Sequence, residues 1–198
     1  MIKFNNKNKL DPSHNSLYVS YLRTVQISCG NYPYPEDIHN LIMLVKNNLS
    51  EKLDKATNVY GGMTDWTFFI NEPIFLKFLT WFINTHQISN PTLRNFHEFK
   101  MLKEAWGNEL KKGHSVQLHE HFDFHGILYL TKGSPLIVPE LNIHMIPEPG
   151  DYYFFPPCIK HYVPEVESDD TRYCIVFNIG PRADWDKKKR LNLSNIIS

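Results

Sequence analysis

The sequence has few cysteines and no excess of charge of either sign. Its three cysteines, Cys29, Cys158 and Cys174, are an odd number without a Cys-x-x-Cys spacing, which argues against a disulfide framework and against a thiolate zinc site. Lys plus Arg and Asp plus Glu both number 21, so the formal net charge is zero. Because no global field attracts nucleic acid or an acidic membrane, neither partner is indicated.

The sequence also lacks a long hydrophobic run. Its first ten residues, MIKFNNKNKL, contain lysine and asparagine where a signal peptide requires apolar residues. No apolar stretch approaches the ~20 residues that a membrane-spanning helix needs. We therefore expect a soluble, cytoplasmic protein.

What is present is enough apolar surface for one core. The 198 residues are 42% hydrophobic and 14% aromatic, which favours a single domain over the whole chain. Within it we expect a helical or mixed N-terminal support at 1–96, a β-rich core at 97–181 and a polar C-terminal tail at 182–198. The tail contains the run KKKR and is expected to be solvated.

The N-terminal part carries helical patterns. After Pro35, apolar residues recur with helical spacing from Ile38 to Leu53, which predicts an amphipathic helix lying on another layer. The aromatic segment 64–70 is expected to form a short strand. Segment 74–86 is apolar on most sides, so we expect a largely buried second helix.

From His97 onward the pattern changes to short β-like runs separated by glycine and proline. Such spacing, with no helical pattern between the runs, favours an antiparallel arrangement over βαβ units. We therefore predict a mainly β fold: a double-stranded β-helix, or jelly roll, with the N-terminal helices packed on one sheet.

The stretch LHEHFDFHG, residues 118–126, is rich in histidine. On a strand, side chains two residues apart share a face, so His119 and His121 are expected to point into the roll. Val116 and Leu118 would then face the helical layer. An unpaired buried polar group costs about 1 to 3 kcal/mol, and a divalent cation would satisfy these histidines.

A third imidazole can come from His161, which follows the strand-ending Pro156-Pro157 pair. If its strand lies beside that of His119 and His121, three imidazoles converge with other positions open to water. This geometry suits iron, zinc, nickel or copper. The alternative is that these histidines are ordinary hydrogen-bonded residues.

From Trp106 to Ile179 the chain resembles the iron(II)- and 2-oxoglutarate-dependent oxygenases, especially a small group frequent in phages and marine bacteria. The residues that carry the resemblance are Trp106 and Asn108, Lys112-Gly113, His119 and His121, Tyr129-Leu130, Pro147 and Gly150, Phe155-Pro156, His161, Arg172, and Phe177-Asn178.

The resemblance implies a site and a reaction. It implies that His119 and His161 bind Fe(II), although zinc or nickel could occupy the site after purification. It also implies that Arg172 and Tyr129 bind the distal carboxylate of the cosubstrate 2-oxoglutarate, with Asn108 as a further cosubstrate contact. The implied reaction is hydroxylation of a small-molecule or peptide substrate with release of succinate and CO2.

One position departs from the family pattern. The wider superfamily has a carboxylate two residues after the first histidine, where this chain has His121. Three neutral imidazoles would leave the site with one more positive charge than usual. Asp123 could instead complete the ligand set as part of a shifted His121-x-Asp123 pair; we prefer His119 with His121.

The same residues also resemble the cupins, which share the jelly roll. In that alignment His125 stands where the cupin motif has glutamate, giving a site of His119, His121, His125 and His161. The alternative functions are thus a cupin-type dioxygenase or isomerase that does not use 2-oxoglutarate, or a non-catalytic roll that binds a small molecule. The helix-covered face and Trp185 could support a homodimer.

Overall fold

The computed structural model describes residues 27–53, 56–86, 100–181 and 191–192. Its elements, in chain order, are β1 (Ser28–Asn31), α1 (Pro35–Asn47), β2 (Val59–Tyr60), β3 (Gly62–Met63), the 3-10 helix η1 (Phe68–Asn71), α2 (Pro73–His86), β4 (Lys100–Leu110), β5 (Ser115–His119), β6 (Phe124–Tyr129), β7 (Leu136–Val138), the 3-10 helix η2 (Pro139–Leu141), β8 (Ile143–Met145), β9 (Asp151–Phe155), β10 (His161–Val163), β11 (Arg172–Pro181) and β12 (Leu191–Asn192).

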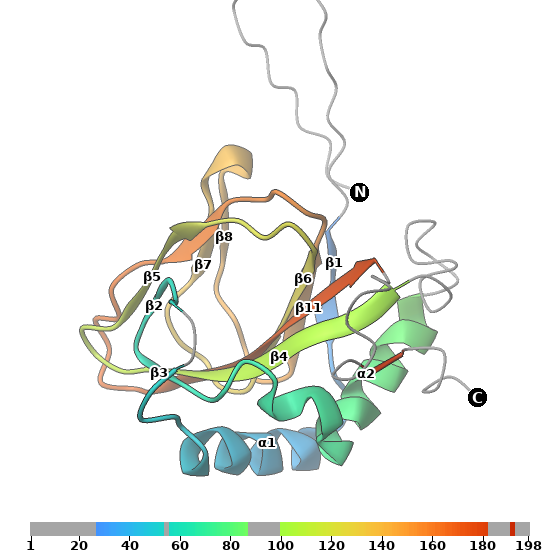
Figure 1. Cartoon of the computed structure of the whole chain (residues 1–198). Helices are drawn as coiled ribbons and strands as arrows, with labels where there is room; N and C mark the ends of the chain where they lie inside the picture. The colour runs from blue at the N-terminus through green and yellow to red at the C-terminus, as the bar shows by residue number, and fades with distance from the viewer. Residues whose placement is uncertain (1–26, 54–55, 87–99, 182–190, 193–198) are drawn as a thin grey trace, which may run out of the picture.

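The strands form two antiparallel sheets that face each other (Figure 1). The larger sheet has the order β1-β9-β6-β11-β4-β12, with β3 paired to β4, and the smaller has the order β2-β5-β10-β7-β8. Helices α1 and α2 lie on the outer face of the larger sheet. This arrangement confirms the predicted jelly roll with helices packed on one sheet.

The alternation of side chains along each strand creates two cores. On β11, Ile175 and Phe177 face the helices, whereas Cys174 and Val176 face the space between the sheets. The helix-facing core is rich in aromatic rings. For example, the ring centroids of Phe78 on α2 and Phe177 on β11 lie 6.0 Å apart. Because the helices cover the outer face of the larger sheet, the polar residues of its inner face line the interior of the roll.

Two expectations for the N-terminal part need correction. Helix α1 ends at Asn47, so the helical spacing that continues to Leu53 overstates its length. The strand expected at 64–70 is wrong, because residues 68–71 form η1 instead. Phe69 and Ile70 are adjacent and both buried, so this segment lacks the alternation of a half-buried strand.

Both ends of the chain contribute to the larger sheet. Strand β1 pairs with β9, and β12 pairs with β4, so two residues of the tail expected to be solvated lie in a sheet. The rest of that tail, including Trp185 and the KKKR run, lies outside the described residues.

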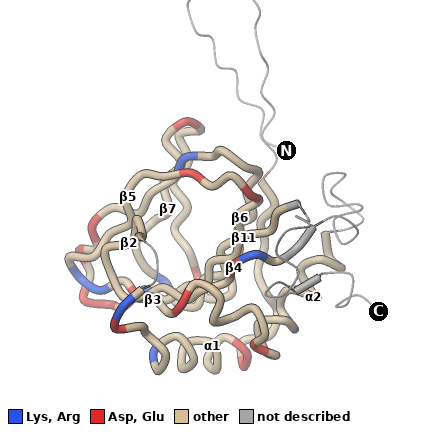
Figure 2. Tube along the Cα trace, in the orientation of Figure 1, with Lys and Arg blue, Asp and Glu red and all other residues tan. Residues whose placement is uncertain are grey.

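Positive and negative residues are mixed along the described chain, in keeping with the zero formal net charge. Figure 2 shows Lys and Arg interspersed with Asp and Glu over the loops and helix α1. Within the described ranges, neither helix combines the length and the apolar character needed to cross a membrane.

Candidate metal centre

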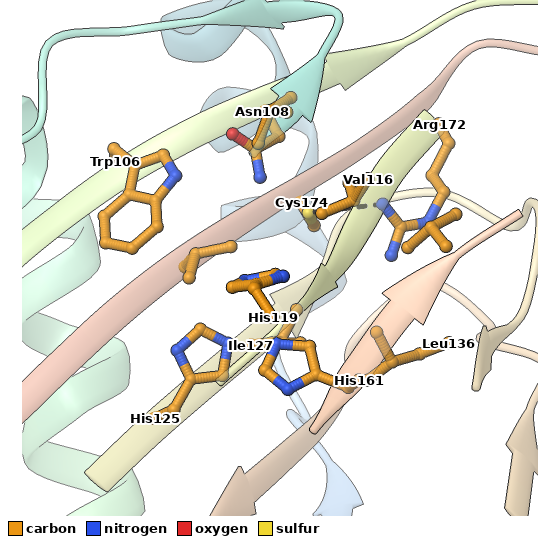
Figure 3. Close-up of a pocket in the computed structure, with 13 residues that line it drawn as sticks. Trp106, Asn108, Val116, His119, His125, Ile127, Leu136, His161, Arg172 and Cys174 are labelled. Carbon is orange, nitrogen blue, oxygen red and sulfur yellow. Dashed lines mark hydrogen bonds between the residues drawn. The ribbon is translucent and has the colours of Figure 1, made fainter. Parts of the chain in front are cut away.

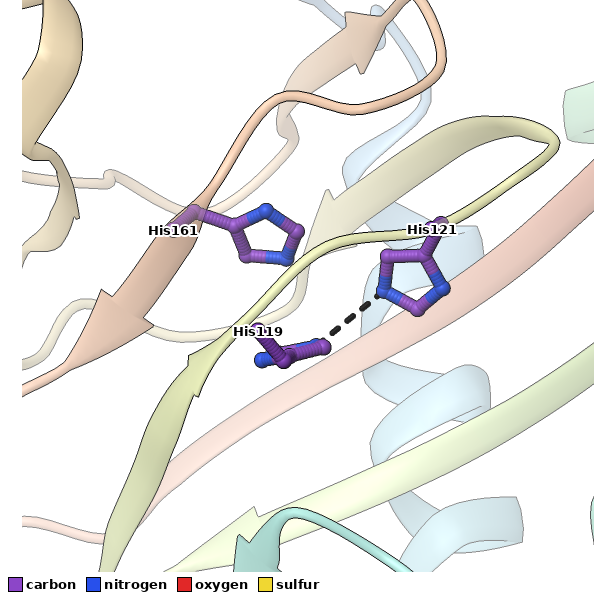
Figure 4. Close-up of side chains that lie close together, drawn as sticks. All are labelled: His119, His121 and His161. Carbon is purple, nitrogen blue, oxygen red and sulfur yellow. Dashed lines mark hydrogen bonds between the residues drawn. The ribbon is translucent and has the colours of Figure 1, made fainter.

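Three histidines meet at one end of the roll. His119 and His161 stand opposite each other on the paired strands β5 and β10, with ring centroids 4.5 Å apart. His121 follows β5, and its Nε2 lies 3.1 Å from Nε2 of His119 (Figure 4). The possible ligand nitrogens of the three residues all lie within 4.8 Å of one another. The structure therefore brings together the three residues expected to bind the metal.

Two of these rings are oriented by backbone carbonyls. Nδ1 of His119 lies 2.7 Å from the carbonyl oxygen of Gln117, and Nδ1 of His161 lies 2.9 Å from that of Ile159. Because a carbonyl oxygen only accepts, each Nδ1 must carry the hydrogen. In the neutral ring this leaves the Nε2 lone pair available, which is the arrangement usual for metal-binding histidines.

Burial keeps these imidazoles neutral. It lowers the pKa of His121 to about 3 and that of His161 to about 4, and it lowers the pKa of His119 as well. Neutral imidazole is the form that binds a metal ion. The Nε2 separation of 3.1 Å between His119 and His121 is close to the roughly 3.3 Å between neighbouring nitrogens of a tetrahedral zinc site. The three residues thus fit a divalent cation.

Asp123 is not brought into this group. Both of its carboxylate oxygens lie 2.8 Å from Nζ of Lys103. Among the described residues, the possible ligand group consists of His119, His121 and His161. The geometry therefore favours His121 over Asp123 as the third ligand.

His125 lies beside the group and makes other contacts. Its buried ring stacks on His121 at a centroid distance of 3.8 Å and an interplanar angle of 10°. Its Nδ1 lies 3.0 Å from Oδ1 of Asn178, whose Nδ2 donates to Glu104 over 3.0 Å. Glu104, Asn178 and His125 are register partners on β4, β11 and β6. Asn178 thus holds the His125 ring in place, and the His125 ring packs against that of His121.

A pocket extends from the histidines between the two sheets (Figure 3). His119, His125 and His161 line one part of it and Arg172 lines another, with mainly aliphatic side chains between them. Arg172 is only 2% exposed. Its Nη1 lies 3.6 Å from Sγ of Cys174, its Nε has no hydrogen-bond partner, and no carboxylate of the described residues pairs with it. Asp169, three residues before Arg172 in the sequence, pairs instead with Lys112, whose Nζ lies 2.9 Å from Oδ1 of Asp169.

Tyr129 lies close to this guanidinium, and Asn108 lines the same pocket. Both face Cys174 in the sheet register, Tyr129 from β6 and Asn108 from β4. Tyr129 is fully buried, its ring lies 5.0 Å from Cζ of Arg172, and its hydroxyl has no hydrogen-bond partner. Burial raises the pKa of Tyr129, so the phenol remains a neutral hydrogen-bond donor. A buried cation and an unpaired donor therefore share one region of the pocket.

The predicted facing of β5 is wrong in part. Val116 lines the pocket instead of facing the helices, and Leu118 is 56% exposed. The helices cover the other sheet, and the pairing of β10 with β5 shifts in register between His161 and Val163. This irregularity allows Val116 and His119, three residues apart, to line the same pocket.

No role in the site was predicted for Trp106 or Cys174, although both line the pocket. Their positions along the strands could have indicated this. Trp106 lies two residues before Asn108 on β4, and Cys174 lies two residues after Arg172 on β11. Residues two apart on a strand share a face.

The fold is shared with solved oxygenase structures. No protein-family model matches the chain, and the search of curated proteins finds no match. A prolyl-4-hydroxylase from Pseudomonas putida matches with a TM-score of 0.59 and 14% identity, over 81% of this chain and 95% of that one. The viral collagen prolyl hydroxylase of Paramecium Bursaria Chlorella virus-1, in a truncated form, matches with a TM-score of 0.58 and 13% identity, over 86% and 99%.

A third solved structure carries ligands. HygX from Streptomyces hygroscopicus, with nickel and 2-oxoglutarate bound, matches with a TM-score of 0.56 and 12% identity, over 80% of this chain and 84% of that one. At these identities the likeness shows the fold. The chain thus has the fold of 2-oxoglutarate-dependent oxygenases.

Proposed function

We propose that this protein is an Fe(II)- and 2-oxoglutarate-dependent oxygenase that hydroxylates a small-molecule or peptide substrate in the cytoplasm. In the balanced reaction, substrate, O2 and 2-oxoglutarate give hydroxylated substrate, succinate and CO2. The observation that carries the proposal is a buried Arg172 without a carboxylate partner among the described residues, in the same pocket as His119 and His161 of the proposed ligand group.

The charge of the pocket favours an anion. Burying an unpaired charge costs several kcal/mol, which a bound carboxylate would offset. A guanidinium can hold a carboxylate through two parallel hydrogen bonds, and the unpaired hydroxyl of Tyr129 can donate a third. We assign the distal carboxylate of 2-oxoglutarate to Arg172 and Tyr129.

The histidines hold the metal at the other part of the pocket. Nδ1 of His119 and of His161 donates to a backbone carbonyl, so Nε2 of each would be free to bind the ion, and His121 would supply the third nitrogen. When bound, iron with O2 and 2-oxoglutarate supplies the oxidising power for hydroxylation. The aliphatic walls exclude water, which strengthens the attraction between Arg172 and an anion. Zinc or nickel could replace iron in the purified protein, since geometry alone does not exclude them.

A cupin-type metalloenzyme that does not use 2-oxoglutarate is the second candidate. It is favoured by the absence of a carboxylate from the ligand group in the described residues. It leaves the buried Arg172 and Tyr129 without a function, so we prefer the oxygenase.

Substitution of Arg172 tests the proposal. We expect Arg172→Met to weaken 2-oxoglutarate binding by about 2 to 5 kcal/mol, roughly 30- to 4,000-fold, because one partner of a buried charge pair is lost. Metal affinity should not change. Isothermal titration under anaerobic conditions, first with Fe(II) and then with 2-oxoglutarate, measures both.

Lys112→Met is the matched control, because Lys112 is exposed and pairs with Asp169 on the surface. It should leave 2-oxoglutarate binding unchanged. Wild-type succinate production by Arg172→Met would rule out the role assigned to the guanidinium.

A further inference from the structure

The wall of the pocket formed by β4 carries a second set of unpaired polar atoms. Nε1 of Trp106 and Oδ1 of Asn108 have no hydrogen-bond partner, although their residues are only 3% and 4% exposed. The two residues are two apart on β4 and both line the pocket. In Figure 3 the nitrogen edge of the Trp106 indole is turned toward the amide of Asn108.

These two atoms have opposite hydrogen-bonding requirements. An indole N–H can only donate. The amide oxygen of Asn108 can only accept a hydrogen bond, and it has no partner. An unsatisfied buried polar group destabilises the folded chain, so the pair favours a partner that both accepts and donates. A hydroxyl or a carboxamide has this property.

The cosubstrate does not meet this requirement. At neutral pH 2-oxoglutarate carries two carboxylates and a ketone, and none of these groups donates a hydrogen bond. It could accept from Trp106, but it cannot satisfy the oxygen of Asn108. Its proposed anchors, Arg172 and Tyr129, lie on β11 and β6. We therefore assign Asn108 a different ligand from the one implied by the family resemblance.

We infer that Trp106 and Asn108 form a donor–acceptor site that binds a hydroxyl or carboxamide group of the primary substrate beside the metal centre. This inference rests on the proposed function, which it deepens by naming the substrate chemistry. The Trp106 and His121 rings have centroids 6.5 Å apart, so a group held by the pair lies next to a proposed metal ligand. The substrate is then a polar, hydrogen-bonding molecule rather than a hydrocarbon or a simple carboxylate.

The test follows the Trp106 indole N–H signal by NMR. The full chain is labelled with 15N and loaded with Zn(II) and 2-oxoglutarate, which is diamagnetic and supports no turnover. Propionamide is titrated as the donor–acceptor ligand. Propionate and N,N-dimethylpropionamide are the controls, because each accepts hydrogen bonds without donating one. Trp106→Phe assigns the signal, and the Trp81 indole in the helical core is the internal reference.

We expect propionamide to shift the Trp106 signal, with at least tenfold weaker responses to both control compounds. Asn108→Leu should weaken the propionamide response at least tenfold. The inference is overturned if propionate acts as well as propionamide, or if Asn108→Leu leaves the response intact. It is also overturned if no compound shifts the signal, since the pair would then hold only water.

The design separates this inference from the proposed function. The titration is repeated without metal and 2-oxoglutarate, so a failure of either to bind leaves the propionamide response measurable. The comparison of the three compounds on the wild-type chain stands even if Asn108→Leu does not fold.

Discussion

The four clustered histidines differ in what holds each ring. His119 and His161 are oriented by carbonyl oxygens, and His125 by the amide of Asn178. The Nδ1 of His121 has no such anchor among the described residues, and its ring rests against His125 at 3.8 Å. The position of the third proposed ligand therefore depends on packing as well as on its own strand.

Substitutions of His125 test this dependence. His125→Ala should weaken metal binding roughly 10- to 100-fold, the range seen when supporting groups behind metal ligands are lost. His125→Phe keeps a stacked ring without a nitrogen, so it should retain most of the affinity. Competition with a chelator measures the dissociation constant of each variant.

Asp123→Asn is the control, because its carboxylate pairs with Lys103 and lies outside the ligand group. Equal loss of metal in His125→Phe and His125→Ala would show that a nitrogen is needed at this position. That result would favour the four-histidine, cupin-type site.

At the scale of elements, helix α1 packs closely against the larger sheet. The approach is close at Gly107 of β4, where an added Cβ would lie 2.5 Å from Cγ2 of Val45 and 3.2 Å from the Phe69 ring. The neighbours of Gly107 on the same strand, Trp106 and Asn108, face the pocket. One face of β4 therefore packs against helix α1, and its other face lines the pocket.

We expect Gly107→Ala to destabilise the fold by about 1 to 3 kcal/mol, because an added methyl group overpacks this contact. Urea denaturation measures the change as a lower midpoint with an unchanged slope. Met43→Ala, on the exposed side of α1, should have little effect. An unaltered midpoint in Gly107→Ala would mean that the helix can shift without cost.

At the scale of the whole molecule, neutral buried histidines make stability depend on pH. Burial lowers the pKa of His119, His121, His125 and His161 in the folded chain. In the unfolded chain they titrate near 6.5, so below that pH the unfolded state binds more protons than the folded state. The free energy of unfolding therefore falls as the pH is lowered.

For the metal-free chain we expect this fall between pH 6.5 and 5, with a slope approaching about 1.4 kcal/mol per pH unit for each such histidine. Urea titrations at several pH values measure the slope. His125→Phe should make it shallower, because one of the four groups is removed. Stability that is constant or rises on acidification would contradict the assignment of neutral histidines.

The sequence by itself determined which residues could form the site and which segments have the apolar spacing of strands or helices. Short alternating runs predicted the jelly roll, and helical spacing predicted two helices against one sheet, because these patterns reflect which face of an element is buried. The residues His119, His121, His161 and Arg172 could be chosen from their spacing and from the family resemblance.

Only the tertiary structure decided which side chains meet. The choice between His121 and Asp123 depended on Lys103, which is distant in sequence and pairs with the carboxylate. The shifted register of β5 and β10 brought Val116 into the pocket, and the unpaired state of Trp106 became visible only when its surroundings were known. The spacing of apolar residues and the composition show which face of a helix or strand is buried. Strand register and long-range pairing decide which residues that face contacts. The local sequence does not encode those contacts.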